Sequence, residues 1–246
     1  MPSSVQRKRV RKSPAARRAE IVAAAAQVAL TEGLECITLR RIAEDLDVRP
    51  GLISHYFPSA EELVAEAFGR AAGRELDALL PNERAEGSPA RYLARFFALA
   101  TGAAYDDVSR LWINARHLSR YRPALRERVG VQEAAWRERF ASVIEDGVRD
   151  DGFRTDSPLL TAIHILVVLD GLGAQANSGT VDRPQAVAQL AVTTAERELG
   201  LENGTLSRLA DKLTEADLDR VRNPPPPSGR TAGLHGHDPA RDEPHS

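Results

Sequence analysis

The run from Val48 to Phe57, VRPGLISHYF, places hydrogen-bonding side chains among apolar ones within a single short segment. Its apolar residues Ile53 and Phe57 are four positions apart, a spacing that puts both on one face of a helix. Its polar side chains are of the kinds that bind phosphate oxygens and base edges. They are Arg49, Ser54, His55 and Tyr56. The run therefore predicts a helix that is buried on one side and offers hydrogen-bonding groups on the other.

Other residues that could take part in catalysis or ligand binding do not belong to a recognisable motif. We find no Ser, His and Asp set with a recognisable catalytic arrangement, so we expect no enzyme and no cofactor. Cys36 is expected to be a small buried hydrophobic residue, and His164, within an apolar run, to make one hydrogen bond inside the core. Asp170 lies in the same run and must be paired or functional. Its possible partners are a second copy of the chain, a backbone group or a cationic ligand.

The elements that would position the first run are short helices. Pro14–Glu32 has apolar residues at helical spacing and should end at Gly33. Thr38 is a natural N-cap for a second helix, ITLRRIAEDLDV. Arg49 precedes Pro50 and is therefore disfavoured in the α region, whereas Pro50 suits the first position of a third helix. Two helices joined by so short a turn form a helix-turn-helix, whose second helix enters the DNA major groove.

These residues also carry a family resemblance. TLRRIAEDLDVRPGLISHYFPSAEELVAEAF resembles the DNA-binding domain of TetR-type transcriptional repressors, and GLISHYF followed by S-x-E-E-L resembles the BetI-like branch. The resemblance spans roughly residues 17–68 and implies sugar-phosphate contacts from Thr38, His55 and Tyr56. It further implies contacts at or near base edges from Arg40, Arg49, Pro50, Gly51 and Ser54.

Two positions depart from the pattern of the family. Asp47 stands where a turn glycine is usual, but aspartate tolerates the left-handed conformation, so we expect the turn to persist. Ala60 stands where a phosphate-binding lysine is usual, which puts one backbone contact in doubt. The first 18 residues hold seven basic and no acidic side chains. Such an arm can follow phosphates or enter the minor groove, or it can be a disordered segment with only non-specific attraction.

Charge and cysteine content bound the class of protein. Residues 1–58 contain ten Lys and Arg against six acids, although the whole chain carries a net charge of −2. A basic N-terminal part on an acidic body indicates a polyanionic partner, the alternative being a solvated basic tail. A single cysteine allows no internal disulfide and favours the cytoplasm. No apolar run approaches the ~18 residues of a membrane span, and we expect no membrane association.

The remaining chain predicts an all-α fold. Long amphipathic patterns follow a loop at 81–89, and residues 159–172 are apolar almost all round, which indicates either the core or a surface covered by a second copy. We expect an N-terminal three-helix helix-turn-helix domain followed by a helical domain for ligand binding and dimerisation. The expected parts are a disordered basic arm (1–13), the DNA-binding domain (14–58), a connecting helix (59–80), the effector-binding and dimerisation domain (81–200), an extra helix (201–222) and a disordered tail (223–246).

The tail contains His235, His237 and His245. Without cysteine or structured carboxylates nearby, these histidines are expected to be solvated, so we predict no metal site.

The family resemblance implies a homodimer and a small-molecule cavity among the middle helices. Betaine-responsive relatives suggest a quaternary ammonium in an aromatic cage as one hypothesis. The candidate ligand-binding residues are Phe97, Trp112, Arg116, His117, Tyr121, Trp136, Phe140 and Asp170.

Together these expectations describe a cytoplasmic regulator that binds a pseudo-palindromic double-stranded DNA operator and is released by an unknown effector. The alternatives are a ligand-independent DNA-binding regulator, and a helical interaction module or enzyme with a vestigial helix-turn-helix.

Overall fold

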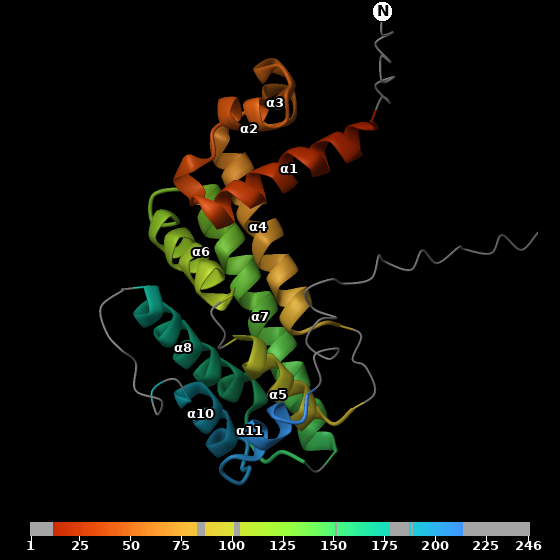
Figure 1. The fold of residues 1–246 in the computed structure, drawn as a ribbon, viewed down its shortest axis with the longest axis vertical. Coiled ribbons are helices and arrows are strands. Elements are labelled where there is room, and N and C mark those ends of the chain that lie inside the picture. The colour runs from red at the N-terminus through yellow and green to blue at the C-terminus, as the bar shows by residue number, and fades with distance from the viewer. Residues whose placement is uncertain are drawn as a thin grey trace, which may run out of the picture.

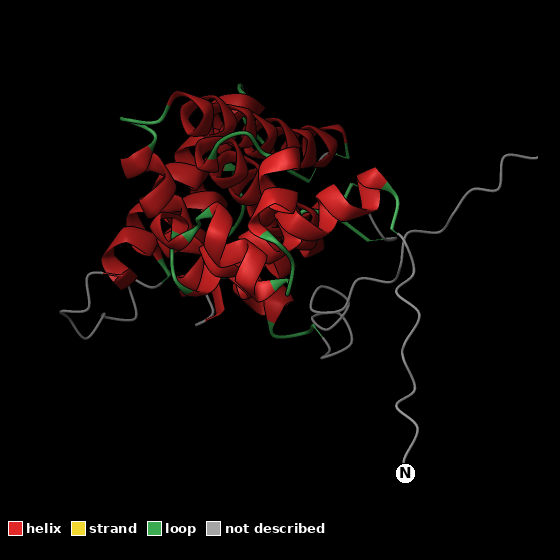
Figure 2. Cartoon of the chain, turned by 90° about the horizontal axis from the view of Figure 1, so that it is seen from above, coloured by secondary structure: helices red, strands yellow, loops and turns green. Residues whose placement is uncertain are grey.

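The computed structural model describes residues 12–82, 87–100, 104–150, 152–177, 187 and 189–213, without the side chains of 104–107. The described residues form helices, turns and loops with no strand among them (Figure 2). The predicted all-α class is therefore confirmed. The first eleven residues and the chain from residue 214 onward, where most of the predicted basic arm and the predicted tail lie, are outside the described part.

Three helices form the N-terminal unit at one end of the molecule (Figure 1). They are α1 (Pro14–Thr31), α2 (Leu39–Asp45) and α3 (Pro50–Tyr56), with a short 3₁₀ turn, η1 (Leu34–Cys36), between the first two. The Ser13 side chain accepts a hydrogen bond from the backbone N–H of Ala16 and caps α1. Gly33 follows α1 with a positive φ of 106°, which ends the helix where the sequence predicts.

α4 (Ala60–Leu79) connects this unit with the rest of the chain. The Ser59 hydroxyl accepts from the N–H of Glu62 and caps it. α4 packs against α1 at one end and against α7 along its length (Figure 1). One helix thus contacts both the N-terminal unit and the body.

In the part of the body that the structure describes there are six further helices. They are α5 (Pro89–Ala100), α6 (Ala104–Leu118), α7 (Pro123–Arg149), α8 (Pro158–Asn177), α10 (Leu190–Glu198) and α11 (Thr205–Ala210). The buried side chains of both parts belong to one continuous hydrophobic cluster. Burial of apolar surface therefore holds the N-terminal unit and the body together.

A buried carboxylate positions the short helix α11, which packs against α5. Glu196, 1% exposed, accepts hydrogen bonds from the backbone N–H groups of Gly204 at 2.8 Å and Leu206 at 2.7 Å. These groups lie at the start of α11, where free N–H donors and the helix dipole both favour a negative charge.

α8 is the most apolar helix, yet much of its surface is open. Leu160 is 55% exposed and Val167 is 62% exposed. Among the described helices, only α8 is long and apolar enough to cross a membrane by length and composition, and a third of it is buried. Core helices of soluble proteins meet the same two criteria, so length and composition alone do not identify α8 as a membrane span.

Two expectations about single residues are wrong. Cys36 is exposed rather than buried, and its Sγ lies 3.5 Å from the carbonyl oxygen of Glu32. His164 lies on the open side of α8, where its Nδ1 is 3.2 Å from a carboxylate oxygen of Glu198 on α10. Its predicted single polar contact exists, but the side chain is 57% exposed and not in the core.

Candidate nucleic-acid interface and ligand cavity

Local interactions fix the geometry of α2 and α3. The Thr38 hydroxyl accepts from the N–H of Arg41 at 3.1 Å, which confirms the predicted N-cap of α2. Arg49 is extended, with φ −70° and ψ 139°, and Pro50 opens α3. Ile53 and Phe57 are 0% and 1% exposed. α3 is therefore held from one side and leaves its other side free.

The turn between the two helices persists without a glycine. Asp47 has a φ of 51°, and it is the only non-glycine residue of the described chain with a positive φ. The N–H of Val48 then donates to the carbonyl of Ala43 at 2.9 Å, closing the turn. The prediction that aspartate supports this conformation is confirmed.

The predicted DNA-binding residues share an open position on α2 and α3. Those classed as exposed are Thr38, Arg40, Arg49, Pro50, Gly51, Ser54 and His55, whereas Tyr56 is half-buried. The His55 and Tyr56 rings meet edge to face, with centroids 5.2 Å apart. The Arg40 side chain is 84% exposed and pairs with Glu44 at 2.8 Å, a contact that DNA could replace at little cost. Their role in binding DNA stays a prediction.

The described end of the basic arm is attached to the folded unit. Lys12 Nζ lies 2.6 Å from a carboxylate oxygen of Glu20. Arg18 pairs with Glu66 of α4 at 3.1 Å and lies 4.8 Å over the ring of Phe57. Phosphate contacts of the preceding eleven residues stay a prediction.

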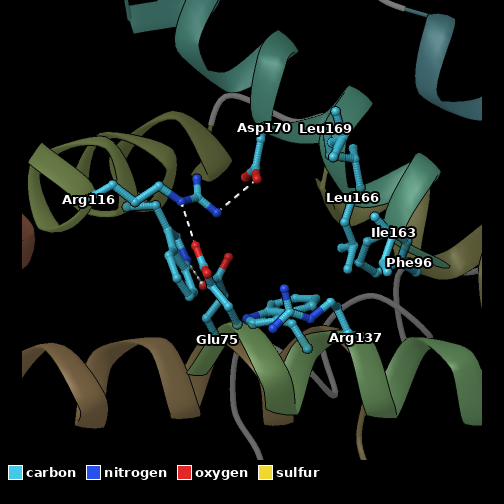
Figure 3. A pocket seen from close by; sticks show the side chains of 12 residues that line it. Glu75, Phe96, Arg116, Arg137, Ile163, Leu166, Leu169 and Asp170 are labelled. Carbon is cyan, nitrogen blue, oxygen red and sulfur yellow. Dashed lines mark hydrogen bonds and ion pairs between the residues drawn. The ribbon is translucent and has the colours of Figure 1, made fainter. Parts of the chain in front are cut away.

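A cavity of about 220 Å³ lies in the body between α4, α5, α6, α7 and α8. In Figure 3, Arg116 and Asp170 lie on one side and the apolar Ile163 and Leu166 on another, around a common space. The full lining is Glu75, Phe96, Trp112, Arg116, Glu133, Trp136, Arg137, Ile163, Leu166, Val167, Leu169 and Asp170. A mostly apolar wall with a few converging polar groups is typical of small-molecule sites.

The structure places half of the predicted ligand-binding residues on this cavity. Those that line it are Trp112, Arg116, Trp136 and Asp170. Those that do not line it are Phe97, His117, Tyr121 and Phe140. Phe97 and Phe140 pack into the core beside Phe96. Tyr121 follows α6, is 74% exposed and meets the ring of His117, in the last turn of α6, edge to face. A binding role for all eight stays untested.

Sequence reasoning missed Glu75, the most unusual residue of the cavity. It is buried, and its Oε2 accepts from Trp112 Nε1 at 2.8 Å. Burial raises the pKa of Glu75 to about 8, partly opposed by the Trp112 hydrogen bond. The available signal was its register, since Glu75 follows Ala71 and precedes Leu79 by four residues on the buried stripe of α4.

Arg116 links the charged groups of the cavity. Its guanidinium lies 2.9 Å from Glu133 and 2.8 Å from Asp170, and it is 5.1 Å from the centroid of the Trp112 ring. Asp170 is thus paired, as its apolar context requires, but its partner is a side chain of the same chain and none of the three partners that the sequence suggested. Desolvation still raises the pKa of Asp170 despite the opposing charge of Arg116.

Two helices connect the cavity with the N-terminal unit. α4 carries Glu75 near one end and Glu66 nearer the other, where Glu66 pairs with Arg18 of α1. α6 carries Trp112 and Arg116, and between them Asn114 accepts from the N–H of Leu34 at 3.0 Å. The cavity and the N-terminal unit therefore share two helices, α4 and α6.

Comparison with known proteins agrees with this arrangement. The N-terminal model of bacterial regulatory proteins of the tetR family matches residues 21–67, and the C-terminal model of BetI-type transcriptional repressors matches residues 97–199. Among curated proteins, no sequence matches the chain.

Solved structures share the fold. A TetR-family transcriptional regulator from Cytophaga hutchinsonii has a TM-score of 0.63 and 20% identity, over 79% of this chain and 99% of its own. GusR of Salmonella enterica has a TM-score of 0.60 and 20% identity, over 77% and 98%. A transcriptional regulator from Saccharomonospora viridis, solved in complex with choline, has a TM-score of 0.62 and 21% identity, over 74% and 97%.

The two family models match the two parts of one fold. The first runs from within α1 to the first turns of α4, and the second runs from the last turn of α5 to the end of α10. The chain is therefore a member of the TetR family of bacterial transcriptional regulators, with a BetI-type C-terminal domain.

Proposed function

We propose that this protein is a sequence-specific repressor that binds a pseudo-palindromic DNA operator as a homodimer and is released by a small molecule. The observation that carries the DNA-binding part is the division of α3 into a buried face and an open polar face. A recognition helix needs both, because the buried face fixes its angle and the open face reaches base edges. A DNA partner also implies a cytoplasmic protein.

The homodimer is supported by the open apolar side of α8. Leu159, Leu160 and Val167 are 49%, 55% and 62% exposed, and Leu190 of α10 is 45% exposed. Clustered apolar surface of this kind is typical of an interface. A two-fold dimer through α8 and α10 would present two copies of α3 to two half-sites of DNA.

Release by a ligand is supported by the position of the cavity. Its walls include α4 and α6, the helices that contact the DNA-binding unit. If a ligand favours a spacing of the two reading helices that does not fit DNA, it weakens DNA binding by the same factor by which DNA weakens ligand binding. The choline complex of the Saccharomonospora relative supports a small-molecule site in this fold.

The ligand-independent alternative would be favoured by a body with a filled interior. The cavity of about 220 Å³ with polar groups in its wall favours the ligand-responsive protein instead.

Fluorescence anisotropy on the DNA upstream of the protein's own gene tests the proposal, with a scrambled sequence as control and two salt concentrations. We expect tight binding of the native DNA that survives the higher salt, because base contacts add to the salt-sensitive phosphate contacts. Equal, salt-sensitive binding of both DNAs would contradict specific reading at this site.

A further inference from the structure

Two buried polar atoms of the cavity residues lack a hydrogen-bond partner. They are Glu75 Oε1 and Trp136 Nε1, and they are the only such side-chain atoms in the described part of the chain. Leaving such atoms unpaired is unfavourable, and buried orphan groups are rare in native proteins. The two residues lie on different helices, α4 and α7, yet both line the same cavity. An occupant of this cavity is therefore the candidate partner for both atoms.

Glu75 Oε1 and Trp136 Nε1 require different hydrogen-bonding groups on a ligand. Trp136 Nε1–H is only a donor and needs an acceptor. Glu75 holds a proton at neutral pH while no cation lies beside it, and an ammonium group next to it favours the ionised form, whose Oε1 accepts a hydrogen bond. The ligand must therefore carry a hydrogen-bond donor and an acceptor oxygen at separate positions.

The charges around Glu75 indicate that the donor is cationic. Arg116 of α6 already pairs with Glu133 of α7 and Asp170 of α8. Glu75 has no ion pair among the described residues, and Arg137 is the other cation of the cavity wall. With three carboxyls and two guanidinium groups around it, the cavity lacks one positive charge when Glu75 is ionised.

Several of the aromatic rings around the cavity are already engaged by contacts within the protein. The Trp112 face is approached by the Arg116 guanidinium at 5.1 Å, and its Nε1–H is bound to Glu75. Phe96 meets Trp136 and Phe140 edge to face, at centroid distances of 6.3 Å and 5.1 Å. Cation binding here depends on a hydrogen bond to a carboxylate more than on ring faces.

We propose that the cavity binds a compact protonated amine that carries a nearby oxygen, as in an amino alcohol. The ammonium N–H donates to Glu75 Oε1, the oxygen accepts from Trp136 Nε1–H, and the carbon atoms lie against Ile163, Leu166 and Leu169. This inference rests on the proposed role of the cavity as the effector site. It deepens that role by naming the ligand class and the two contacts that select it.

The test is a ligand series that removes N–H groups one at a time. Isothermal titration calorimetry on the full-length protein without DNA would compare ethanolamine, N-methylethanolamine, N,N-dimethylethanolamine and choline. The first three retain an ammonium N–H and should bind. Choline, with none, should bind roughly ten- to a hundredfold more weakly than the dimethyl compound, the range for one charge-assisted hydrogen bond. An aromatic cage would reverse this order, since each methyl group adds apolar surface.

Two variants test the contacts. Glu75→Gln keeps an acceptor for Trp112 but removes the negative charge, and it should weaken binding of the three amines at least as much as the last methyl does. Glu138→Gln removes the same charge from the exposed side of α7 and is the matched control. Trp136→Phe should reduce the advantage of ethanolamine over ethylamine. Circular dichroism of each variant would verify its fold. The ligand series uses the wild-type protein only, so it tests the proposal even if a variant does not fold.

The outcomes separate this inference from the proposed function. Choline binding as tightly as the dimethyl compound, no binding by any member, or unchanged affinity in Glu75→Gln would overturn the amine proposal. Amine binding with the predicted order supports it, even if anisotropy shows no effect on DNA affinity. If the amines bind but do not change DNA affinity, release of DNA by this ligand is refuted, whereas the assignment of the cavity as an amine site is retained.

Discussion

Replacing Glu75 with glutamine should change how the stability of the protein depends on pH. The folded pKa of about 8 exceeds the ordinary value of 4.5 because the carboxyl is fully buried. Between these two values the folded state holds a proton that the unfolded state has lost. The unfolding free energy of the wild type therefore falls as pH rises through this window. Glutamine has nothing to titrate there, so the variant lacks this loss.

The magnitude follows from the two pKa values. By about pH 7 the wild type has crossed roughly 2.5 pH units of the window, at about 1.4 kcal/mol per unit, which is a loss of about 3 kcal/mol relative to pH 4. Because Glu75 is only 9% exposed, solvent screens this contribution little. The difference in unfolding free energy between Glu75→Gln and the wild type should shift by that amount in favour of the variant.

Urea denaturation followed by circular dichroism, at fixed protein concentration and a series of pH values, measures this difference. The variant is its own control for other titrating groups, since these are shared with the wild type and cancel. A difference that stays constant across the window would refute the assignment of Glu75 as a buried acid without a cation. A difference that moves in favour of the wild type would show that the carboxylate has a cationic partner in solution.

Three further predictions concern other parts of the molecule. Tyr56→Phe should weaken binding of all DNA sequences through a lost phosphate contact, whereas Arg49→Ala should alter sequence preference, so equal losses on all sequences would contradict the role of Arg49 in anisotropy assays. Val167→Glu places a charge in the proposed α8 interface and should yield monomers by analytical ultracentrifugation. Val131→Glu changes a similarly exposed valine on α7 and should leave the dimer intact. A Val167→Glu variant that remains dimeric would refute the interface. In α7, Gly147→Ala would bring a methyl group to 2.0 Å from the Phe153 ring and should lower stability by about 1–3 kcal/mol. Gly130→Ala in open space should raise stability by about 0.5–1 kcal/mol, and thermal melts that rank the two alike would contradict the packing.

The N-terminal helices were predictable because their signals are local. A cap such as Thr38 and a proline such as Pro50 act within one helical turn. The left-handed Asp47 was predictable for the same reason, since it depends on its own side chain and the turn around it.

The cavity was only partly predictable because it depends on which side of each helix faces inward. His164 and Cys36 were assigned to the core from their apolar neighbours, but a run that is apolar all round does not indicate its inner face. Tyr121 and His117 were chosen by residue type and lie beyond the cavity. Glu75 was missed because an acid on the buried stripe of α4 has meaning only once Trp112 of α6 is known to lie against it.

The measurement that tests the central claim most directly is the selection of bound sequences from a pool of random DNA by the full-length protein. We predict one enriched inverted repeat, with half-sites separated by about one turn of DNA or a modest multiple of it. The enrichment should disappear with Val167→Glu, which leaves α3 intact but removes the second copy. A pool that stays random, although the protein binds it at low salt, would contradict the account, because only non-specific phosphate contacts would then remain.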